Sequence, residues 1–396
     1  MKNYEEVYSS KMLFWTIYRY ELKKIFSHSI KLLVLLAVAA FLFIVSAQRY
    51  FSDSCEQQSW KAEQSLDGRI MDENFFTEMR ESADQEESGL WYFATLYARK
   101  VFRYNESQSI LNSSEEQEEW TEDTFYETRK RVIDEFADAF YLTREERDYL
   151  DEIEEGNPKP FTYRSTAAVQ NLRGTYQFTM TITCLLITVF LSGSFAGESE
   201  DKTDSLIYSS KYGHKYAVAA KLIAGCTFSL AIGIMMLLMT HIPVAIFGGI
   251  HGLDAPWYMV MPFSVMPVKA WKMLLLHTVV YLLGCILTGL LAMMLSLLFD
   301  RSMAAAGTVF ALILCDLFGS VPTHMRVLSQ IRYLTPISVL LNSNVPDMRL
   351  TKLFGKYLIS FQIGTLLYSL CGLLLVIITV GIFRRRYCRK NDPCRF

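Results

Sequence analysis

Six long apolar segments constrain the fold of this chain more than any other feature of its sequence. A helix needs about 20 mostly apolar residues to cross the ~30 Å hydrocarbon layer, and every backbone polar group in that layer must be satisfied internally. The fifth segment carries one charge, Asp316, near one end. The pattern predicts an all-α polytopic membrane protein with six transmembrane helices. The segments are Ile30–Ala47, Phe178–Phe195, Leu222–Ile246, Met273–Leu298, Met303–Val321 and Ile363–Phe383.

Charge is divided unevenly along the chain. The formal net charge is −2, and 51% of the residues are hydrophobic. Residues 49–176 hold 29 Asp and Glu against 15 Lys and Arg, a balance of −14, which leaves 24 basic against 12 acidic residues elsewhere, a balance of +12. An acidic island inside a basic, apolar chain excludes a simple soluble enzyme and argues against nucleic-acid binding.

The basic residues near the spans predict the orientation of the chain. Six spans place both termini on one side, and both terminal segments are rich in Lys and Arg, as cytoplasmic segments are. The acidic segment then lies outside the cell. The segment 322–362 would also lie outside, and it departs from the rule because it is basic, with Arg326, Arg332, Arg349, Lys352 and Lys356. The expected organisation is a cytoplasmic N-terminus (1–29), span 1 (30–48), an extracytoplasmic domain (49–176), span 2 (177–196), a cytoplasmic loop (197–217), spans 3–6 (218–383) with the outer helical segment 322–362, and a basic cytoplasmic tail (384–396).

The N-terminal segment 8–28 has the pattern of an amphipathic helix. Apolar and aromatic residues recur every three or four positions, and basic residues occupy another face. Such a helix lies in the membrane interface with its basic face toward anionic headgroups, so lipid is an expected partner. The alternative is a plain cytoplasmic extension of the first span. The residues that define the two faces are Phe14, Ile17 and Tyr18, and Arg19, Lys23 and Lys24.

The extracytoplasmic domain is predicted to be mainly helical. Thr143 and Glu146 form a capping box at the start of one helix. The stretch Trp120–Tyr141 places apolar residues at helical intervals among Arg129, Lys130 and Arg131. The acidity of this domain would steer cationic substrates, or it is simply a solvated surface.

The loop 197–217 is short and charged, yet it holds a compact apolar element, Leu206, Ile207, Tyr208 and Tyr212. Asp204 is placed to cap a short helix there that would end at Gly213. An exposed apolar tip between two spans is suited to docking into a groove on another protein. The spacing is equally consistent with a helix that lies on the membrane surface.

The sequence contains no motif for catalysis or for metal binding. It has no phosphate-binding loop, no His-Glu-x-x-His and no Cys-x-x-Cys, so we expect no catalytic residue, no metal and no cofactor in this chain. Three ionisable residues, His241, His277 and Asp316, fall within predicted spans. Such groups are costly in a membrane, and they serve either in proton relays or in hydrogen bonds between helices.

These features together resemble the permease subunit of a bacterial ABC exporter, of the type-2 permease family. The layout is that of the family: an interfacial helix, one span, a large outer domain, a second span with an acidic cytoplasmic loop, and four further spans. Ser210-Lys211 stands where the family often has a proline. The segments that carry the resemblance are Tyr20–Lys24, Glu198–Glu200, Lys202–Leu206, Ser209–Gly213, Lys221 and Tyr333–Pro336.

The resemblance implies partners and a coupling site. Two copies of a cytoplasmic ABC ATPase, which would bind ATP and Mg, would receive the loop as a coupling helix. A second permease half, identical or related, would complete the transporter in the bacterial cell membrane. Leu206, Ile207 and Tyr208 would fill the ATPase groove, and Glu198 and Glu200 would hold the loop against the N-terminal helix. The whole expected coupling set is Glu198, Glu200, Thr203, Leu206, Ile207, Tyr208, Lys211, Tyr212 and Gly213.

The sequence leaves the substrate open. The apolar and aromatic spans favour an amphiphilic cargo, such as a peptide, an antibiotic or a lipid-like molecule, and a sodium-exporting permease is the alternative within the same family. A different class, a membrane sensor or scaffold whose outer domain binds a ligand, would also need a partner. A secondary transporter is disfavoured because neither inverted repeats nor a charged pathway is visible.

Overall fold

The computed structural model describes residues 2–26, 29–48, 50–51, 64–83, 97, 100–101, 121–203, 216–341 and 345–391. Helices dominate this part of the chain, in agreement with the predicted all-α class, and its one sheet is a two-stranded antiparallel hairpin. The elements are α1 (Lys2–Ile25), α2 (Ser29–Gln48), α4 (Glu73–Ala83), α7 (Glu122–Ala139), α8 (Arg144–Glu155), α9 (Ala167–Leu191), α10 (Gly193–Glu200), α12 (Val218–Pro243), η4 (Val244–Gly248), α13 (Trp257–Val260), α14 (Ala270–Phe299), α15 (Ser302–Phe318), α16 (Arg326–Tyr333), α17 (Pro336–Val339), η5 (Pro346–Met348), β1 (Thr351–Leu353), β2 (Lys356–Leu358) and α18 (Ser360–Asn391).

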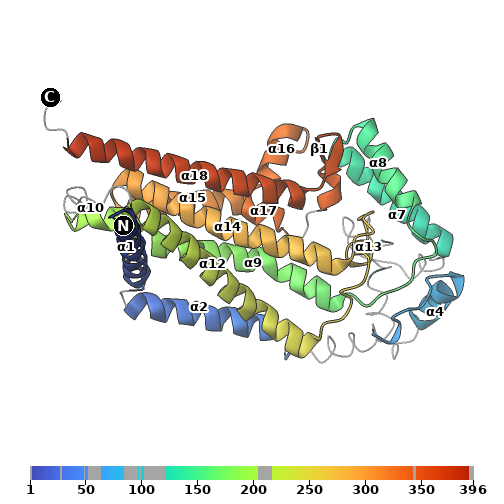
Figure 1. Ribbon diagram of the computed structural model, residues 1–396. Coiled ribbons are helices and arrows are strands. Elements are labelled where there is room, and N and C mark those ends of the chain that lie inside the picture. The colour runs from blue at the N-terminus through green and yellow to red at the C-terminus, as the bar shows by residue number, and fades with distance from the viewer. Residues whose placement is uncertain are drawn as a thin grey trace.

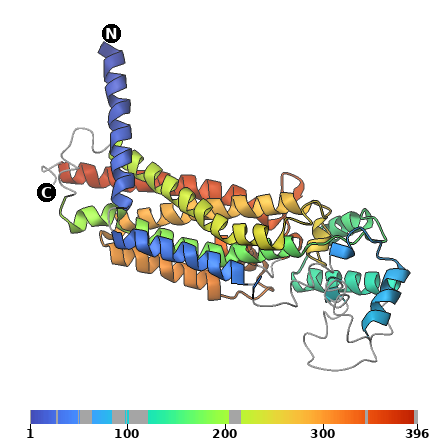
Figure 2. The same ribbon diagram turned by 90° about the horizontal axis from the view of Figure 1, so that it is seen from below.

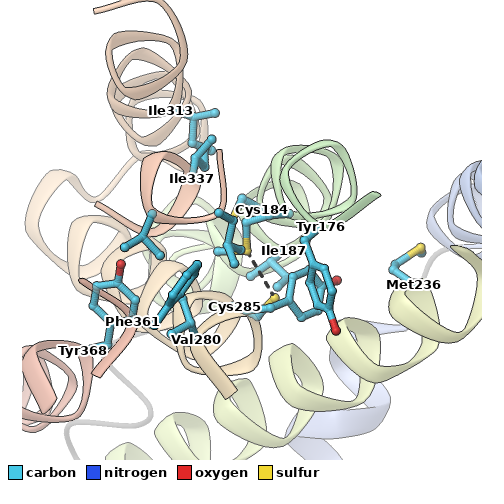
Figure 3. Packing of buried hydrophobic residues seen from close by; sticks show 14 of the residues in the cluster. Tyr176, Cys184, Ile187, Met236, Val280, Cys285, Ile313, Ile337, Phe361 and Tyr368 are labelled. Carbon is cyan, nitrogen blue, oxygen red and sulfur yellow. Dashed lines mark hydrogen bonds between the residues drawn. The ribbon is translucent and has the colours of Figure 1, made fainter. Parts of the chain in front are cut away.

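The long helices form one bundle, and α14 lies at its centre. It packs against α9, α12, α15 and α18. In the core, Tyr176, Cys184 and Ile187 of α9 lie against Val280 and Cys285 of α14 (Figure 3). This packing buries the apolar faces that the six sequence segments supply.

Five helical stretches in the described part of the chain are long and apolar enough to cross a membrane: Ser29–Gln48, Ala167–Glu200, Val218–Gly248, Ala270–Phe299 and Ser360–Arg386. The sixth expected span, Met303–Val321, corresponds to α15, an apolar helix of 17 residues. At about 1.5 Å per residue it is about 26 Å long, slightly less than the hydrocarbon layer. The protein is therefore a multi-pass membrane protein, and its described residues contain five candidate spans and one shorter apolar helix.

The bundle has two unlike ends (Figure 1). We call the end where both termini lie the terminal end, and the opposite end the domain end. The described residues 64–166, with α4, α7 and α8, form an inserted domain at the domain end. Figure 2 shows α1 lying steeply across the bundle at the terminal end.

The inserted domain has its own aromatic core, with Phe75, Phe76, Phe125 and Phe161 all fully buried. The same core includes Ala255, Tyr258 and Met259, which belong to the segment between α12 and α14. The capping box at Thr143 and Glu146 forms as the sequence predicts and starts α8. A connection between two spans thus completes the core of a domain that is inserted elsewhere in the chain.

Candidate functional site

At the terminal end, a cluster of buried charges joins α1, α10 and α12. The carboxylate of Glu198 on α10 is 10% exposed and accepts a hydrogen bond from Lys24 Nζ at 2.9 Å. Lys221 Nζ on α12, which is 1% exposed, also contacts Glu198 and lies 3.3 Å from Glu21 on α1. Because a buried charge is costly unless it is paired, each of these groups depends on the others.

Lys24 is held inward by this cluster. Burial alone would lower the pKa of Lys24, but the hydrogen bond and the charge of Glu198 outweigh that effect, so its pKa is raised. The sequence pattern placed Lys24 on the basic face of the N-terminal helix, toward anionic headgroups. In the structure Lys24 points toward Glu198, while Arg19 and Lys23 are exposed. Phe14, Ile17 and Tyr18, expected to face lipid, are partly buried, and Tyr18 lies 3.3 Å from Thr227 of α12.

The short helix α10 is connected to the rest of the bundle by further hydrogen bonds. Ser296 of α14 accepts from the backbone N–H groups of Phe195 and Ala196 at 3.1 and 2.9 Å. Ser199 donates to Asp300 at the end of α14 at 3.3 Å, and Arg386 of α18 pairs with the same carboxylate. The segment that leads into the predicted coupling loop is therefore bonded to α1, α12, α14 and, through Asp300, α18.

Glu200 makes a different contact from the one expected. Its two carboxylate oxygens accept from the backbone N–H and the hydroxyl of Ser302, at 2.8 and 2.9 Å. Glu200 therefore caps the start of α15 and does not hold the loop against α1. A free N–H at a helix start attracts a carboxylate, and this satisfies α15 without help from its own N-terminal residue.

The other predicted coupling residues divide into two groups. Thr203 donates its backbone N–H and its hydroxyl to the carbonyl of Glu198, at 2.9 and 3.3 Å, and so closes the end of α10. The remaining six lie outside the described residues: Leu206, Ile207, Tyr208, Lys211, Tyr212 and Gly213.

A cavity of about 620 Å³ adjoins the charge cluster. Its wall includes residues of α1, α2, α9, α10, α12 and α15. It combines charged side chains of both signs with the apolar side chains of Phe190 and Phe310; the charged residues are Glu21, Lys24, Lys31, Glu200, Asp201 and Lys221. Lys31 lies 5.7 Å from the ring centre of Phe190. A wall of this kind suits a molecule with both an apolar and a charged or polar part.

At the domain end, Arg129 of α7 is the central buried charge. Only 1% of its side chain is exposed. Its guanidinium donates to the carbonyls of Pro262 and Ser264, each at 2.7 Å, and also contacts Glu154 of α8. The inserted domain is thereby fastened to the segment that leads into α14.

A second link runs from that segment to the start of α18. Asn157 donates its side-chain amide to the carbonyl of Val265 at 2.9 Å, and the N–H of Val265 donates to Asp347 at 2.8 Å. Burial raises the pKa of the Asp347 carboxyl, which is fully buried and precedes α18 by a short hairpin.

Sequence reasoning missed Arg129, although its spacing of four residues from both Phe125 and Ile133 puts it on the buried face of α7.

The three ionisable residues that fall within predicted spans all find partners or lie in aromatic surroundings. Asp316 accepts from Arg332, Thr335 and Ser338 at 2.6, 2.5 and 2.6 Å, so it anchors α16 and α17 to the end of α15. His277 lies 2.7 Å from the carbonyl of Met273, and His241 lies 3.2 Å from Thr240. Among the described residues, no three His, Cys, Asp or Glu side chains form a group suited to a metal ion.

A comparison with models of protein families finds a match. The model of the family described as ABC-2 family transporter protein matches residues 15–391, nearly the whole chain. The chain belongs to the ABC-2 transporter family. It is a membrane permease of an ABC transporter, a transporter subunit and not an enzyme by itself, and membership implies association with an ABC ATPase. A comparison with curated proteins and one with solved structures returned no match.

Within this ABC-2 permease, the two buried clusters lie at opposite ends of the bundle (Figure 1). The cluster around Glu198 lies directly before the loop that follows α10. The cluster around Arg129 lies where the inserted domain meets the spans. Buried charges thus connect both α10 and the inserted domain to the bundle.

Proposed function

We propose that this permease is the six-span half of an ATP-driven exporter, with both termini and the loop 197–217 in the cytoplasm of a bacterial cell. The inserted domain then lies outside. The sixth span is α15. Its first residue, Ser302, bonds to Glu200 at the terminal end, and Asp316 in its last turn bonds to Arg332 at the domain end. Its 17 residues are fewer than those of the other spans, but its two ends bond to opposite ends of the bundle, and a small mismatch with the bilayer is tolerated.

The observation that carries the proposal is the set of hydrogen bonds and ion pairs that α10 makes with other helices. This helix of eight residues directly precedes the coupling loop and bonds to α1, α12, α14 and α15. A force applied to the loop by a closing ATPase would reach four helices through Glu198, Glu200 and the α10 backbone. A loop that merely rested on the membrane would need no such connection.

The expected ATPase contact is the apolar element Leu206, Ile207 and Tyr208, with Lys211, Tyr212 and Gly213 completing the coupling helix. Two ATPase copies would supply ATP and Mg, and a second permease half, identical or related, would complete the pathway. Alternating access driven by ATPase closure would then move the substrate outward.

An amphiphile is the cargo that the inner cavity fits best. The cavity of about 620 Å³ is within the usual size range of small-molecule sites, and it sets Lys31 against Phe190 and other apolar side chains. A molecule with an apolar body and a polar or charged group would satisfy both parts of this wall, which contains basic and acidic side chains.

The test is a double substitution, Leu206→Asp with Tyr208→Asp, in the permease expressed with its ATPase. We expect the protein to insert normally, because the changes lie in a loop, and substrate-stimulated ATP hydrolysis to fall to the basal rate. A charge buried at a protein interface costs several kcal/mol. The matched control is Lys202→Asp in the same loop, which should keep stimulation. Normal transport and stimulation by the double variant would overturn the coupling assignment.

A further inference from the structure

A second cavity lies at the domain end, between α2, α9 and the junction of α12 with η4. Its volume is about 290 Å³. We call it the three-helix cavity; the lining residues that matter are Ser46, Tyr50, Asn171, Phe178, Thr240 and Val244. It is separate from the inner cavity, which adjoins the charge cluster at the terminal end.

Two polar side chains in this wall have no hydrogen-bond partner within the described part of the chain. Ser46 of α2 is 7% exposed, and Asn171 of α9 is partly buried. Two other hydroxyls of the wall are already used, because Thr175 donates to the carbonyl of Leu172 at 2.8 Å and Thr240 to that of Leu237 at 2.9 Å. Both residues line the cavity, and an unpaired polar group at membrane depth is costly, so Ser46 and Asn171 are placed to bond to a ligand that enters the cavity.

The backbone around the cavity is specialised. Pro243 lies inside α12, and the chain continues as the π-helix η4. Helical turns of this type are rare and are often found at functional sites. A Cβ atom at Gly248 would lie 2.9 Å from the ring of Tyr50, so only glycine there lets this ring close one side of the cavity.

The chemistry of the wall defines the class of ligand. The described lining contains no Asp, Glu, Lys or Arg, so nothing there would neutralise a charged group. The amide of Asn171 and the hydroxyl of Ser46 both donate and accept hydrogen bonds. The cavity is partly open, and Phe178 in its wall is 45% exposed among the bundle helices.

We propose that the three-helix cavity binds the uncharged hydroxyl- or amide-bearing part of a membrane amphiphile, with Ser46 and Asn171 as its hydrogen-bonding residues. The volume fits one polar group with part of an apolar chain, not a whole drug-sized molecule. The ligand reaches it sideways from the lipid, since the cavity lies between membrane-spanning helices. This site does not depend on the coupling loop or on an ATPase.

The experiment uses photolabelling of the full-length protein in native membranes. Three diazirine probes of equal chain length are compared: a neutral monoacylglycerol, a fatty-acid anion and an alkyltrimethylammonium cation. Labelled peptides are identified by mass spectrometry. We expect the neutral probe to label the segments 45–50, 171–178 and 240–244 above both charged probes.

Three variants and one control test the residues. Asn171→Leu should reduce labelling by the neutral probe about five-fold, the loss expected for one hydrogen bond. Ser46→Ala should give a similar, smaller loss without adding bulk, and Ser46→Phe should abolish labelling by filling the cavity. Ile44→Phe, on the exposed face of the same helix, should label as the wild type.

Three results would overturn the proposal. Equal labelling of Ser46→Phe and Ile44→Phe would mean that the probe contacts the outside of α2. Equal labelling by all three probes would mean that the wall does not select for neutral groups. Absence of label in these segments would mean that water alone satisfies Ser46 and Asn171. None of these results bears on the ATPase coupling, which the loop variant tests separately.

Discussion

The two ends of the bundle pair their buried charges in different ways. At the terminal end, Lys221 and Lys24 meet the carboxylates of Glu198 and Glu21, so side chains pair with side chains. At the domain end, Arg129 has one carboxylate partner and donates its other N–H groups to the backbone carbonyls of Pro262 and Ser264. The first cluster consists of ion pairs among several helices, whereas in the second a single guanidinium bonds mainly to backbone carbonyls.

This difference teaches how each end is suited to its role. Ion pairs between side chains exchange partners when helices shift, because each lysine offers three rotatable donors. An arginine guanidinium is rigid and planar, so its hydrogen bonds to two backbone carbonyls weaken together when the guanidinium shifts relative to the backbone. We therefore expect the terminal end to move during transport, and the inserted domain to travel as one body with the starts of α14 and α18.

The largest effect is expected from Arg129→Met. The substitution leaves the carbonyls of Pro262 and Ser264 without their donor in a buried place, while Glu154 keeps only its longer contacts with Asn157 and Lys159, at 3.3 and 3.5 Å. Removal of one partner from a buried pair typically costs about 3–5 kcal/mol. Thermal unfolding of the purified protein, with limited proteolysis of the inserted domain, measures the loss. The control Arg131→Met removes a pair whose side chains are 52% and 46% exposed and should cost less than about 1 kcal/mol. Equal stability of the two variants would show that Arg129 does not fasten the domain.

A smaller effect is expected from Lys221→Met, because Glu198 keeps Lys24 as a partner. We expect a loss of about 1–3 kcal/mol, the range for leaving a buried polar group partly unsatisfied, together with weaker stimulation of the ATPase by substrate. Lys24→Met, whose side chain is 37% exposed, is the matched control and should cost less. If Lys24→Met proved the more damaging of the two, α1 and not α12 would be the main support of α10.

The smallest effect concerns pH and Asp347→Asn. Burial raises the pKa of Asp347, so the folded protein holds this proton at a higher pH than the unfolded chain does. Ionised Asp347 therefore costs stability at neutral pH, and the cost falls as the pH is lowered through the raised pKa and vanishes below the unfolded value. The stability advantage of Asp347→Asn over the wild type should shrink from pH 7 to pH 5 in thermal unfolding. An advantage that does not vary with pH would contradict the assignment.

Much of the membrane region could be predicted from sequence, because burial in lipid requires long apolar runs that composition reveals directly. The helix from Glu122 to Ala139 was also predictable, since Phe125, Val132 and Ile133 recur at helical spacing and are buried. The count of clear spans was not, because α15 is short and is completed by contacts at both ends.

The contacts of the charged residues could not be read from the sequence. Arg129 stands beside Lys130 and Arg131 in a run that looks solvated, and its main partners are backbone carbonyls, which no residue type marks. Lys24 belongs to the basic face of an amphipathic helix, and only the position of Glu198, 174 residues later, turns it inward. Contacts of this kind depend on tertiary packing, so spacing along one helix does not specify them.

The central claim is that this ABC-2 permease works with a separate ATPase that contacts the loop after α10. The most direct measurement is affinity purification of the tagged protein from native membranes in mild detergent, with identification of the co-purifying chains by mass spectrometry, for the wild type and for the variant with Leu206→Asp and Tyr208→Asp. The account predicts a stoichiometric chain with a phosphate-binding loop in the wild type, and its loss in the variant. Recovery of the permease alone or with a kinase from wild-type membranes, or equal recovery of the ATPase with both proteins, would contradict it.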